Sequence, residues 1–348
     1  MIPYAIIGTS WISEEFSAAS LCSDLVLAGI YSRSGEKGAA FARKLGLPDI
    51  PIFFSIEELA DAPDIKAVYI ASPNSFHVSQ SEALLRAGKH VLCEKPIATS
   101  PGELKQLQAL AQNRGLAYME AIMYLSTPAR QAVKAVLPEL GEITGAHFDF
   151  SQLSSRYDEL AAGGVPNVFS ATMRGGALND LGIYCAYPAM DFFGPPLGMQ
   201  AQAHLLPTGV DGAGTALLRF PGFTLSLTWS KLGQSRGVSQ IMGTKGTLTI
   251  RSISQFQGVT FHPRDGEARE LAAPMQKHEV MQYEARAFCD YILGRPSAVP
   301  YKEASALALA VAQCMEGIRR SAMLPQTANV SCGSRKAELP HEGQGVIR

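Results

Sequence analysis

Residues 4–19 read YAIIGTSWISEEFSAA, an apolar run followed by a polar turn and an amphipathic stretch. The run at 4–8 predicts a buried strand, and the stretch at 14–19 predicts the helix that follows it. A strand and a helix joined by so short a turn are typical of the first unit of a parallel sheet wound with helices. We therefore take this unit as the start of a doubly wound fold.

The same alternation of apolar runs and amphipathic stretches continues through about the first 120 residues. Residues 67–71 (AVYIA) are apolar throughout, as expected for a strand whose two faces are both covered by helices. We predict an α/β Rossmann domain whose ligand crevice lies at the carboxyl ends of its strands. Strands are predicted at 4–8, 25–31, 52–54, 67–71, 90–93 and 117–120, with helices at 14–19, 38–45, 55–60, 77–87 and 101–112.

The pattern changes after about residue 140. Between Phe223 and Ser230, apolar and hydroxyl-bearing residues alternate, which predicts a strand with one face in water. Turn signals at Asp211-Gly212 and Pro221-Gly222 predict connections between neighbouring strands. We expect an α+β domain with an open, mostly antiparallel sheet at 140–270, one helix near 180–193 and further helices at 278–323. The predicted domains are 1–121 and 122–325, followed by a polar tail at 326–348.

Charge and composition exclude several classes of protein. The chain has 348 residues with 30 basic and 31 acidic side chains, so it lacks the basic surplus of a nucleic-acid binder. Its apolar runs are shorter than the roughly 20 residues that cross a bilayer. The six cysteines form no C-x-x-C pair and the histidines lack metal-ligand spacing, so no metal site is expected. The opening residues lack the basic segment of a secretory signal, and we expect a cytoplasmic protein with a small-molecule substrate.

The turn after the first strand, residues 8–13 (GTSWIS), has the spacing of G-x-G-x-x-G with serine in place of the second and third glycines. Gly8 can make the tight turn, and the following helix offers free N–H groups to a pyrophosphate. The alternatives are a simple turn glycine and, for Trp11, a core residue. The residues that we assign to cofactor binding here are Gly8, Thr9, Ser10, Trp11 and Ile12.

The second predicted strand is followed by Ser32, Arg33 and, one helical turn further on, Lys37. An NAD-selective site usually has an acidic residue at this place, which holds the ribose hydroxyls. A guanidinium can instead pair with the 2′-phosphate of NADP, and we assign all three residues to cofactor binding. A solvated arginine at a helix start is the alternative. NADP is therefore the predicted cofactor, with NAD as the second choice.

Polar residues also follow the fourth and fifth predicted strands, at the same edge of the sheet. Ser72-Pro73-Asn74 comes after the fourth strand and is followed by His77, and Glu94-Lys95-Pro96 comes after the fifth. Because a doubly wound sheet binds its ligands at this edge, we assign Ser72, Pro73, Asn74, His77, Glu94 and Lys95 to the cofactor site. A surface ion pair is the alternative for Glu94 and Lys95, and ordering of the loop is the alternative for His77.

A further motif lies far along the chain, at residues 175–185 (GGALNDLGIYC). It places Asp180 and Tyr184 four residues apart, so that on a helix they share one face. A helix cap is the alternative for Asp180, and a core position is the alternative for Tyr184.

Together these motifs resemble the Gfo/Idh/MocA oxidoreductases, in the order and at the spacing of that family, over about residues 1–325. Met119-Glu120-Ala121 adds to the resemblance. Many members have His where this chain has Tyr184, and the Tyr form is similar to the branch of dimeric dihydrodiol dehydrogenase, xylose-type sugar dehydrogenases and glucose–fructose oxidoreductase. The chain departs from the family pattern at Ser10 and at Thr127, which lies in a segment near the substrate in relatives.

The resemblance implies a nicotinamide cofactor between the two domains, with Lys95, Asp180 and Tyr184 at the nicotinamide and a cis Lys95–Pro96 bond. It also implies hydride transfer to or from a sugar, cyclic polyol or vicinal diol. We predict that Tyr184 is the general acid/base, that the Lys95 ammonium lowers its pKa, and that Asp180 binds a neighbouring hydroxyl or orients Lys95. A homo-oligomer, a dimer or tetramer, is expected through the C-terminal sheet. The predicted substrate contacts are Tyr124, Arg156, Asn167 and Arg174.

Two alternatives keep the fold: a non-catalytic NAD(P)-binding regulator, and a glycosidase that oxidises its substrate transiently with a bound NAD. The presence of Lys95, Asp180 and Tyr184 together argues against a regulator, since a sensor does not need all three. Arg33 argues against the glycosidase, because such an enzyme has no evident use for NADP.

Overall fold

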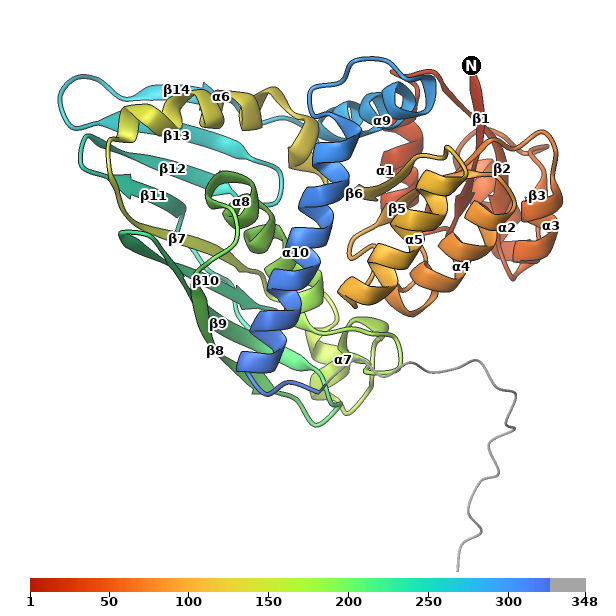
Figure 1. Cartoon of the computed structure of the whole chain (residues 1–348). Helices are drawn as coiled ribbons and strands as arrows, with labels where there is room; N and C mark the ends of the chain where they lie inside the picture. Colours follow the sequence, from red (N-terminus) through yellow and green to blue (C-terminus); the bar gives the residue numbers. More distant parts are fainter. Residues whose placement is uncertain (326–348) are drawn as a thin grey trace, which may run out of the picture.

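The computed structural model describes residues 1–325, so the polar tail predicted at 326–348 lies outside the described residues. Two sheets lie side by side in Figure 1, a parallel one from the first part of the chain and a larger one from the second. The predicted fold class, a Rossmann sheet followed by an α+β unit with a mostly antiparallel sheet, is confirmed.

The first sheet has the strand order β3-β2-β1-β4-β5-β6 and is parallel throughout, which is the doubly wound arrangement. The strand order reverses between β1 and β4, so the crevice opens at the carboxyl ends of these two strands. The strands are β1 (Ile2–Ile7), β2 (Leu25–Tyr31), β3 (Ile52–Phe53), β4 (Ala67–Ile70), β5 (His90–Glu94) and β6 (Tyr118–Ala121). The helices are α1 (Trp11–Ser20), α2 (Gly35–Lys44), α3 (Ile56–Asp61), α4 (Asn74–Arg86) and α5 (Pro101–Asn113).

The segment that leads from β6 to the second sheet is helical, although the sequence pattern predicted no helix there. It contains the short helices η1 (Met123–Ser126) and η2 (Leu137–Leu140) and, between them, α6 (Pro128–Val136). Thr127 caps α6, because its hydroxyl accepts a hydrogen bond from the N–H of Arg130 (3.4 Å). The departure from the family pattern at Thr127 therefore has a local structural role.

The second sheet has the order β14-β13-β12-β11-β7-β10-β9-β8 and is antiparallel except where β7 pairs with β10. The strands are β7 (Ile143–Ser151), β8 (Gly198–Leu205), β9 (Asp211–Phe220), β10 (Phe223–Ser230), β11 (Ser239–Gly243), β12 (Gly246–Ser252), β13 (Gln257–Pro263) and β14 (Arg269–Ala272). Between β7 and β8 lie α7 (Tyr157–Ala161), the 3-10 turn η3 (Asn167–Phe169), the π-helix η4 (Leu178–Gly182) and α8 (Ile183–Phe193).

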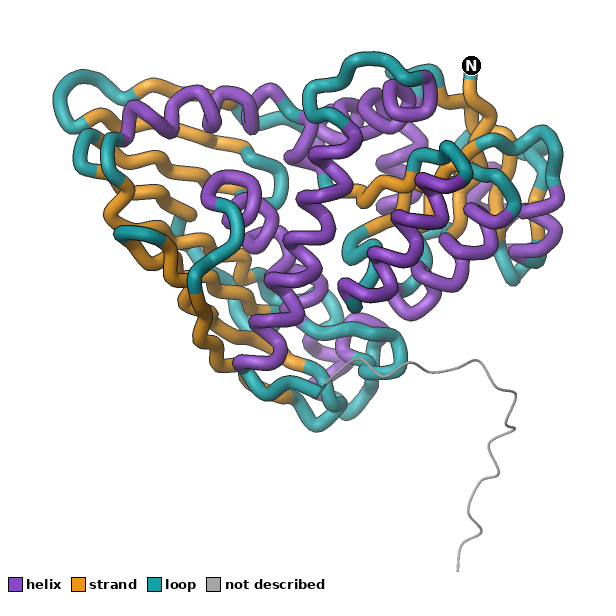
Figure 2. The backbone as a smooth tube through the Cα atoms, in the orientation of Figure 1, coloured by secondary structure: helices purple, strands orange, loops and turns teal. Residues whose placement is uncertain are grey.

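Helices pack on one face of this second sheet (Figure 2), and the alternate residues of β10 on its other face are half-buried or exposed. The predicted homo-oligomer through that face stays a prediction. The predicted turn at Pro221-Gly222 lies between β9 and β10. The turn predicted at Asp211-Gly212 is wrong, because these residues begin β9 and the side chain of Asp211 is buried.

The two C-terminal helices connect the halves of the molecule (Figure 1). Helix α9 (Lys277–Leu293) packs against α1, and α10 (Tyr301–Ser321) packs against α8 and β8 on one side and against α5 and β6 on the other. The largest cluster of buried apolar side chains spans both halves and includes Tyr69 of β4 and Trp229 of β10. The cleft between the sheets is therefore bounded by a shared core.

Candidate active site

The turn between β1 and α1 passes very close to the end of β4. Gly8 has φ +103°, and a Cβ at this position would lie 2.6 Å from the carbonyl oxygen of Ala71. Only glycine fits there without displacing the backbone. Ser10 precedes α1, and its hydroxyl makes no capping hydrogen bond. The positive end of α1 therefore remains available to an anion at the mouth of the crevice.

The end of β2 presents a cation and hydroxyl groups rather than a carboxylate. Arg33 is exposed, and its guanidinium lies 5.7 Å from the centre of the Phe76 ring on α4. The Ser32 hydroxyl donates to the carbonyl oxygen of Ser34 (2.8 Å), and the hydroxyl of Ser34 in turn accepts from the N–H of Lys37 (3.3 Å). Lys37 itself is exposed in the first turn of α2.

A cavity of about 430 Å³ lies between the two halves, at the carboxyl ends of β1, β4 and β5. The second half contributes polar groups to its wall from Gln152, Ser154, Ser155 and Ser254. The predicted site residues that line it are Trp11, Ile12, Ser72, Asn74, His77, Glu94, Lys95, Asp180 and Tyr184. The other predicted cofactor residues lie along the same edge of the first sheet without lining this cavity: Gly8, Thr9, Ser10, Ser32, Arg33, Lys37 and Pro73.

Lys95, Asp180 and Tyr184 meet in this cavity, although Lys95 and Asp180 come from opposite halves. The Lys95 ammonium donates to Oδ1 of Asp180 (2.6 Å) and to its main-chain oxygen (2.9 Å). The same ammonium lies 5.0 Å from the centre of the Tyr184 ring. The Lys95–Pro96 bond is cis, as the resemblance implied. One cation thus contacts both partners that the sequence motifs predicted.

The electrostatics of this group correct one expectation. Burial raises the pKa of the Tyr184 phenol above its ordinary value, and the opposing effect of Lys95 does not offset it. Burial would likewise raise the pKa of the Asp180 carboxyl, but Lys95 and Lys231 hold that pKa well below its usual range. Tyr184 is therefore protonated and Asp180 ionised at neutral pH. Lys95 does lower the pKa of Tyr184, as predicted, but by less than burial raises it.

The turn that carries Lys95 is held from two sides. The ring nitrogens of His77 lie within hydrogen-bond distance of the carbonyl oxygens of Ser72 (2.8 Å) and Pro96 (2.9 Å). The carboxyl group of Glu120 accepts a hydrogen bond from the N–H of Ile97 (2.8 Å), and burial raises the pKa of Glu120 to about 7. His77 thus ties the turn after β4 to the turn after β5, and Glu120 ties the latter to β6.

Two lysines of the cavity were missed in the sequence. Lys231 follows β10 directly and is hydrogen-bonded to Oδ2 of Asp180. Lys277 begins α9, and its ammonium lies 4.3 Å from the centre of the Trp11 ring. The signal for Lys231 was the abrupt charge after an alternating strand, the same kind of signal that identified Lys95 after β5. Lys277 had no comparable signal, since a lysine at the start of a surface helix is unremarkable.

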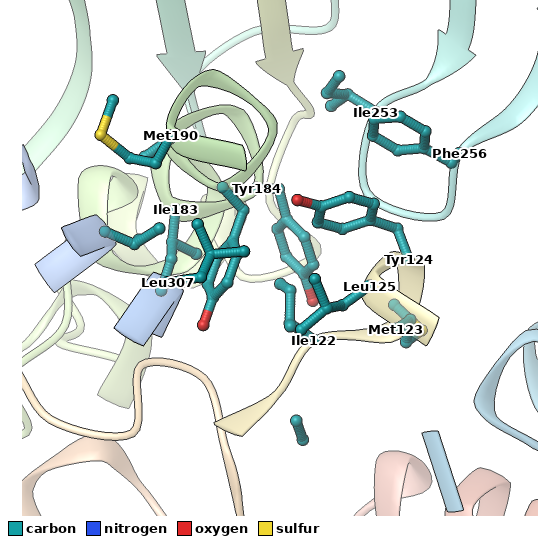
Figure 3. Close-up of a cluster of buried hydrophobic side chains, with 14 of the residues drawn as sticks. Ile122, Met123, Tyr124, Leu125, Ile183, Tyr184, Met190, Ile253, Phe256 and Leu307 are labelled. Atoms are coloured by element: carbon teal, nitrogen blue, oxygen red, sulfur yellow. The ribbon is translucent and has the colours of Figure 1, made fainter. Parts of the chain in front are cut away.

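The structure places the four predicted substrate contacts outside the cavity. Tyr124 is fully buried: its ring stacks on Phe256 (4.5 Å between centres), and its hydroxyl donates to Asp191 (3.4 Å). Figure 3 shows Tyr124 beside Phe256 in a cluster of buried hydrophobic side chains. Arg174 pairs with Glu103 of α5 at 3.0 Å.

The other two, Arg156 and Asn167, are exposed, and Arg156 lies 3.7 Å from Glu159 of its own helical turn. They were predicted as contacts from the second domain, but the chain leaves the cavity wall after Ser155, and both residues lie at exposed positions before it returns to the cavity at η4.

Within residues 1–325, no group of three or more His, Cys, Asp or Glu side chains is arranged to hold a metal ion. No helix in the same part of the chain is long and apolar enough to cross a membrane.

Comparison with known families divides the chain at the same place as the two sheets. Residues 2–122 match the Gfo/Idh/MocA oxidoreductase family with an NAD-binding Rossmann fold. Residues 130–249 match the C-terminal domain of the same family.

Individual relatives agree with this match over most of the chain. The NADP⁺-dependent scyllo-inositol 2-dehydrogenase of Bacillus subtilis is 38% identical, over 84% of this chain and 88% of its own. The human trans-1,2-dihydrobenzene-1,2-diol dehydrogenase is 31% identical, over 71% of this chain and 73% of its own. Among solved structures, a 3-ketoreductase from Actinomadura kijaniata in complex with NADP and TDP-benzene superimposes with a TM-score of 0.79 at 26% identity, over 92% of this chain and 97% of that one.

Proposed function

The chain belongs to the Gfo/Idh/MocA family of NAD(P)-dependent oxidoreductases, and from this we propose that it is an NADP-dependent dehydrogenase of a cyclic polyol or vicinal diol. The observation that carries the proposal is the meeting of Lys95, Asp180 and Tyr184 in one cavity at the carboxyl ends of the Rossmann strands. The relatives named for inositol and for a dihydrodiol support this substrate class. The hydroxyl side chains on the second wall support it as well, since they suit a ligand with many hydroxyl groups.

The residues at the edge of the first sheet fit a phosphorylated dinucleotide. Gly8 lets the first turn approach β4, and the uncapped start of α1 suits a pyrophosphate. Arg33, with Ser32 beside it, stands where an NAD-selective site has a carboxylate, so NADP is the better match. When bound, the nicotinamide supplies the acceptor or donor of the hydride, and the chain's own residues hold the substrate and move the proton.

Tyr184 is the group that moves this proton. Because its phenol is protonated at neutral pH, it is ready to donate to a carbonyl oxygen in the direction of reduction, and it must lose the proton before it accepts one in the direction of oxidation. Lys95 lies against the ring and can hold the reacting oxygen through an N–H. Asp180 is ionised and bonded to lysines on both carboxylate oxygens, so its role is to orient Lys95.

The cofactor assignment is tested by titrating NADPH and NADH by fluorescence. We expect NADPH to bind more tightly, and Arg33→Ser to weaken NADPH by about 10- to 100-fold with little effect on NADH, as loss of charge-assisted hydrogen bonds implies. Arg43→Ser, at an exposed position near the far end of α2, is the matched control. A wild-type preference for NADH would overturn the assignment.

The activity is tested by screening sugars, inositols and vicinal diols for a change in absorbance at 340 nm. Turnover of at least one cyclic polyol or diol is expected. Tight binding of NADPH without turnover of any of them would favour the regulator instead. Cleavage of a glycoside that depends on a bound NAD, with no net reduction of the cofactor, would favour the glycosidase.

A further inference from the structure

Lys231 is a buried lysine held at the rim of the cavity by main-chain hydrogen bonds on both sides. Its N–H donates to the carbonyl oxygen of Gly212 on β9 (2.8 Å), and its carbonyl oxygen accepts from the N–H of Ser154 (3.0 Å). Only 9% of its side chain is exposed, and it lines the cavity. The main chain at Lys231 is therefore fixed by β9 on one side and by the segment that follows β7 on the other.

Lys231 and Lys95 bind the same carboxylate through different oxygens. Lys95 donates to Oδ1 of Asp180, and Lys231 donates to Oδ2. Because both ammonium groups are hydrogen-bonded to one carboxylate, they lie close to each other. Of the two lysines, Lys95 is the one whose ammonium lies over the Tyr184 ring, at 5.0 Å from its centre.

The ammonium of Lys231 has donors to spare. An ammonium carries three N–H groups, and within residues 1–325 the Lys231 ammonium donates a hydrogen bond only to Asp180. Two donors thus remain for whatever enters the cavity. Because a buried donor without an acceptor is unfavourable, this arrangement suits a ligand that brings oxygen atoms.

We propose that Lys231 binds the oxygen on the carbon next to the reacting carbon, while Lys95 holds the reacting oxygen beside Tyr184. Because both lysines are held by Asp180, their ammonium groups can bind two oxygens on adjacent carbons at the same time. The site therefore selects vicinal diols and their α-hydroxy ketone products over simple alcohols. This inference rests on the proposed function and assigns the specificity within it to one residue.

The test compares trans-1,2-cyclohexanediol with cyclohexanol, which lacks the neighbouring oxygen, as substrates with NADP⁺. In the wild-type protein kcat/KM should favour the diol. Lys231→Met should reduce the ratio of the two kcat/KM values by about tenfold or more, mainly through the KM of the diol, as loss of a charge-assisted hydrogen bond implies. Lys231→Arg should keep most of the ratio. The control Lys245→Met removes an exposed lysine from a turn of the same sheet and should change nothing.

The outcomes separate this inference from the function on which it rests. An equal loss of kcat/KM for both substrates in Lys231→Met would show that Lys231 only neutralises Asp180, and it would overturn the inference alone. If the wild-type protein binds NADPH but oxidises neither the diol nor any inositol, the proposed function fails as well. NADPH affinity reports whether the variant is folded, and Lys231→Gln replaces Lys231→Met if the latter does not bind NADPH.

Discussion

At the scale of single residues, Tyr184 shows how burial and a neighbouring charge compete for one phenol. Lys95 lowers the pKa of Tyr184, as expected for a cation near a group that ionises to an anion, but burial raises it by more. The phenol is therefore a proton donor near neutral pH. This favours the direction of reduction under neutral conditions, whereas oxidation needs the small fraction of phenolate.

The first prediction concerns how the rates of reduction and of oxidation depend on pH, and how Tyr184→Phe changes both. Since the pKa of Tyr184 lies above the ordinary value of about 10, reduction should be constant from pH 6 to 9 and be lost only as the pH rises through that pKa. Oxidation should rise with pH over the same range, about tenfold per unit. Tyr184→Phe should lower kcat by about 10²- to 10⁴-fold and remove this slope, with NADPH binding retained.

Initial rates at 340 nm across this pH range are the measurement, with Tyr157→Phe, at an exposed position on α7, as the control. Unchanged turnover in Tyr184→Phe, or a slope that survives the substitution, would show that another group moves the proton.

Lys95, Asp180 and Tyr184 were predicted because they lie in the motifs that carry the family resemblance, which implies that the three residues meet. The sequence did not predict Lys231, because this lysine lies outside the motifs that carry the family resemblance, and its pairing with Asp180 depends on how the end of β10 packs against η4. Tyr124 was predicted to contact the substrate because its segment lies near the substrate in relatives, but the sequence alone does not show that its ring faces Phe256 and the core.

At the scale of elements, the π-helix η4 and helix α8 present the site as one unit. The sequence predicted a single helix near 180–193, whereas Asp180 lies in a π-helical turn that precedes α8, the kind of irregular turn that is frequent at functional sites. Asp211 anchors the start of this turn. Its carboxylate accepts hydrogen bonds from the N–H of Leu178 (2.7 Å) and from the indole of Trp229 (2.7 Å). A Cβ at Gly176 would lie 2.5 Å from Asp211 Oδ1, which explains the second glycine of the motif.

The second prediction concerns this anchor. Asp211→Ala leaves two buried donors without an acceptor, at about 1–3 kcal/mol each, so it should lower the free energy of unfolding by several kcal/mol. It should also reduce turnover, because Asp180 follows Leu178 by only two residues. Asp211→Asn keeps one acceptor oxygen and should be destabilised less. Urea denaturation followed by tryptophan fluorescence in a Trp11→Phe background, where the buried Trp229 is the reporter, measures both variants. A stable Asp211→Ala protein would contradict this role of the carboxylate.

Element boundaries were predictable where the periodicity was strong. Strand β2 was predicted with its observed bounds, and the strand pattern around Phe223–Ser230 gave β10. The prediction failed at Asp211-Gly212, where a common turn dipeptide serves instead to start a strand and to anchor η4. Local chemistry cannot distinguish these uses, because the groups that Asp211 binds come from distant parts of the chain.

At the scale of the whole molecule, the C-terminal helices make the two halves depend on each other. The sequence placed both helices with the second domain, but α9 packs on α1 and α10 also packs on α5. An amphipathic pattern shows that a helix has a buried face without showing which sheet covers it. The shared cluster that includes Tyr69 and Trp229 has the same consequence, because neither half can unfold without exposing apolar surface of the other.

The third prediction is that both halves unfold in one transition and that NADPH stabilises the whole molecule. At 100 times its Kd, NADPH should add about 2.7 kcal/mol to the free energy of unfolding, since it binds the folded state only. Calorimetry should give a single peak that moves to higher temperature. The chain has two tryptophans, and in Trp11→Phe the remaining Trp229 reports only on the second sheet. In Trp11→Phe, the unfolding transition followed by Trp229 fluorescence should shift by as much as the calorimetric peak, with NADPH at 100 times the Kd of this variant. The contrary result is two calorimetric peaks, of which only one moves with NADPH, together with a Trp229 transition that does not move. That result would show that the C-terminal helices do not couple the cofactor half to the half that carries Asp180 and Tyr184.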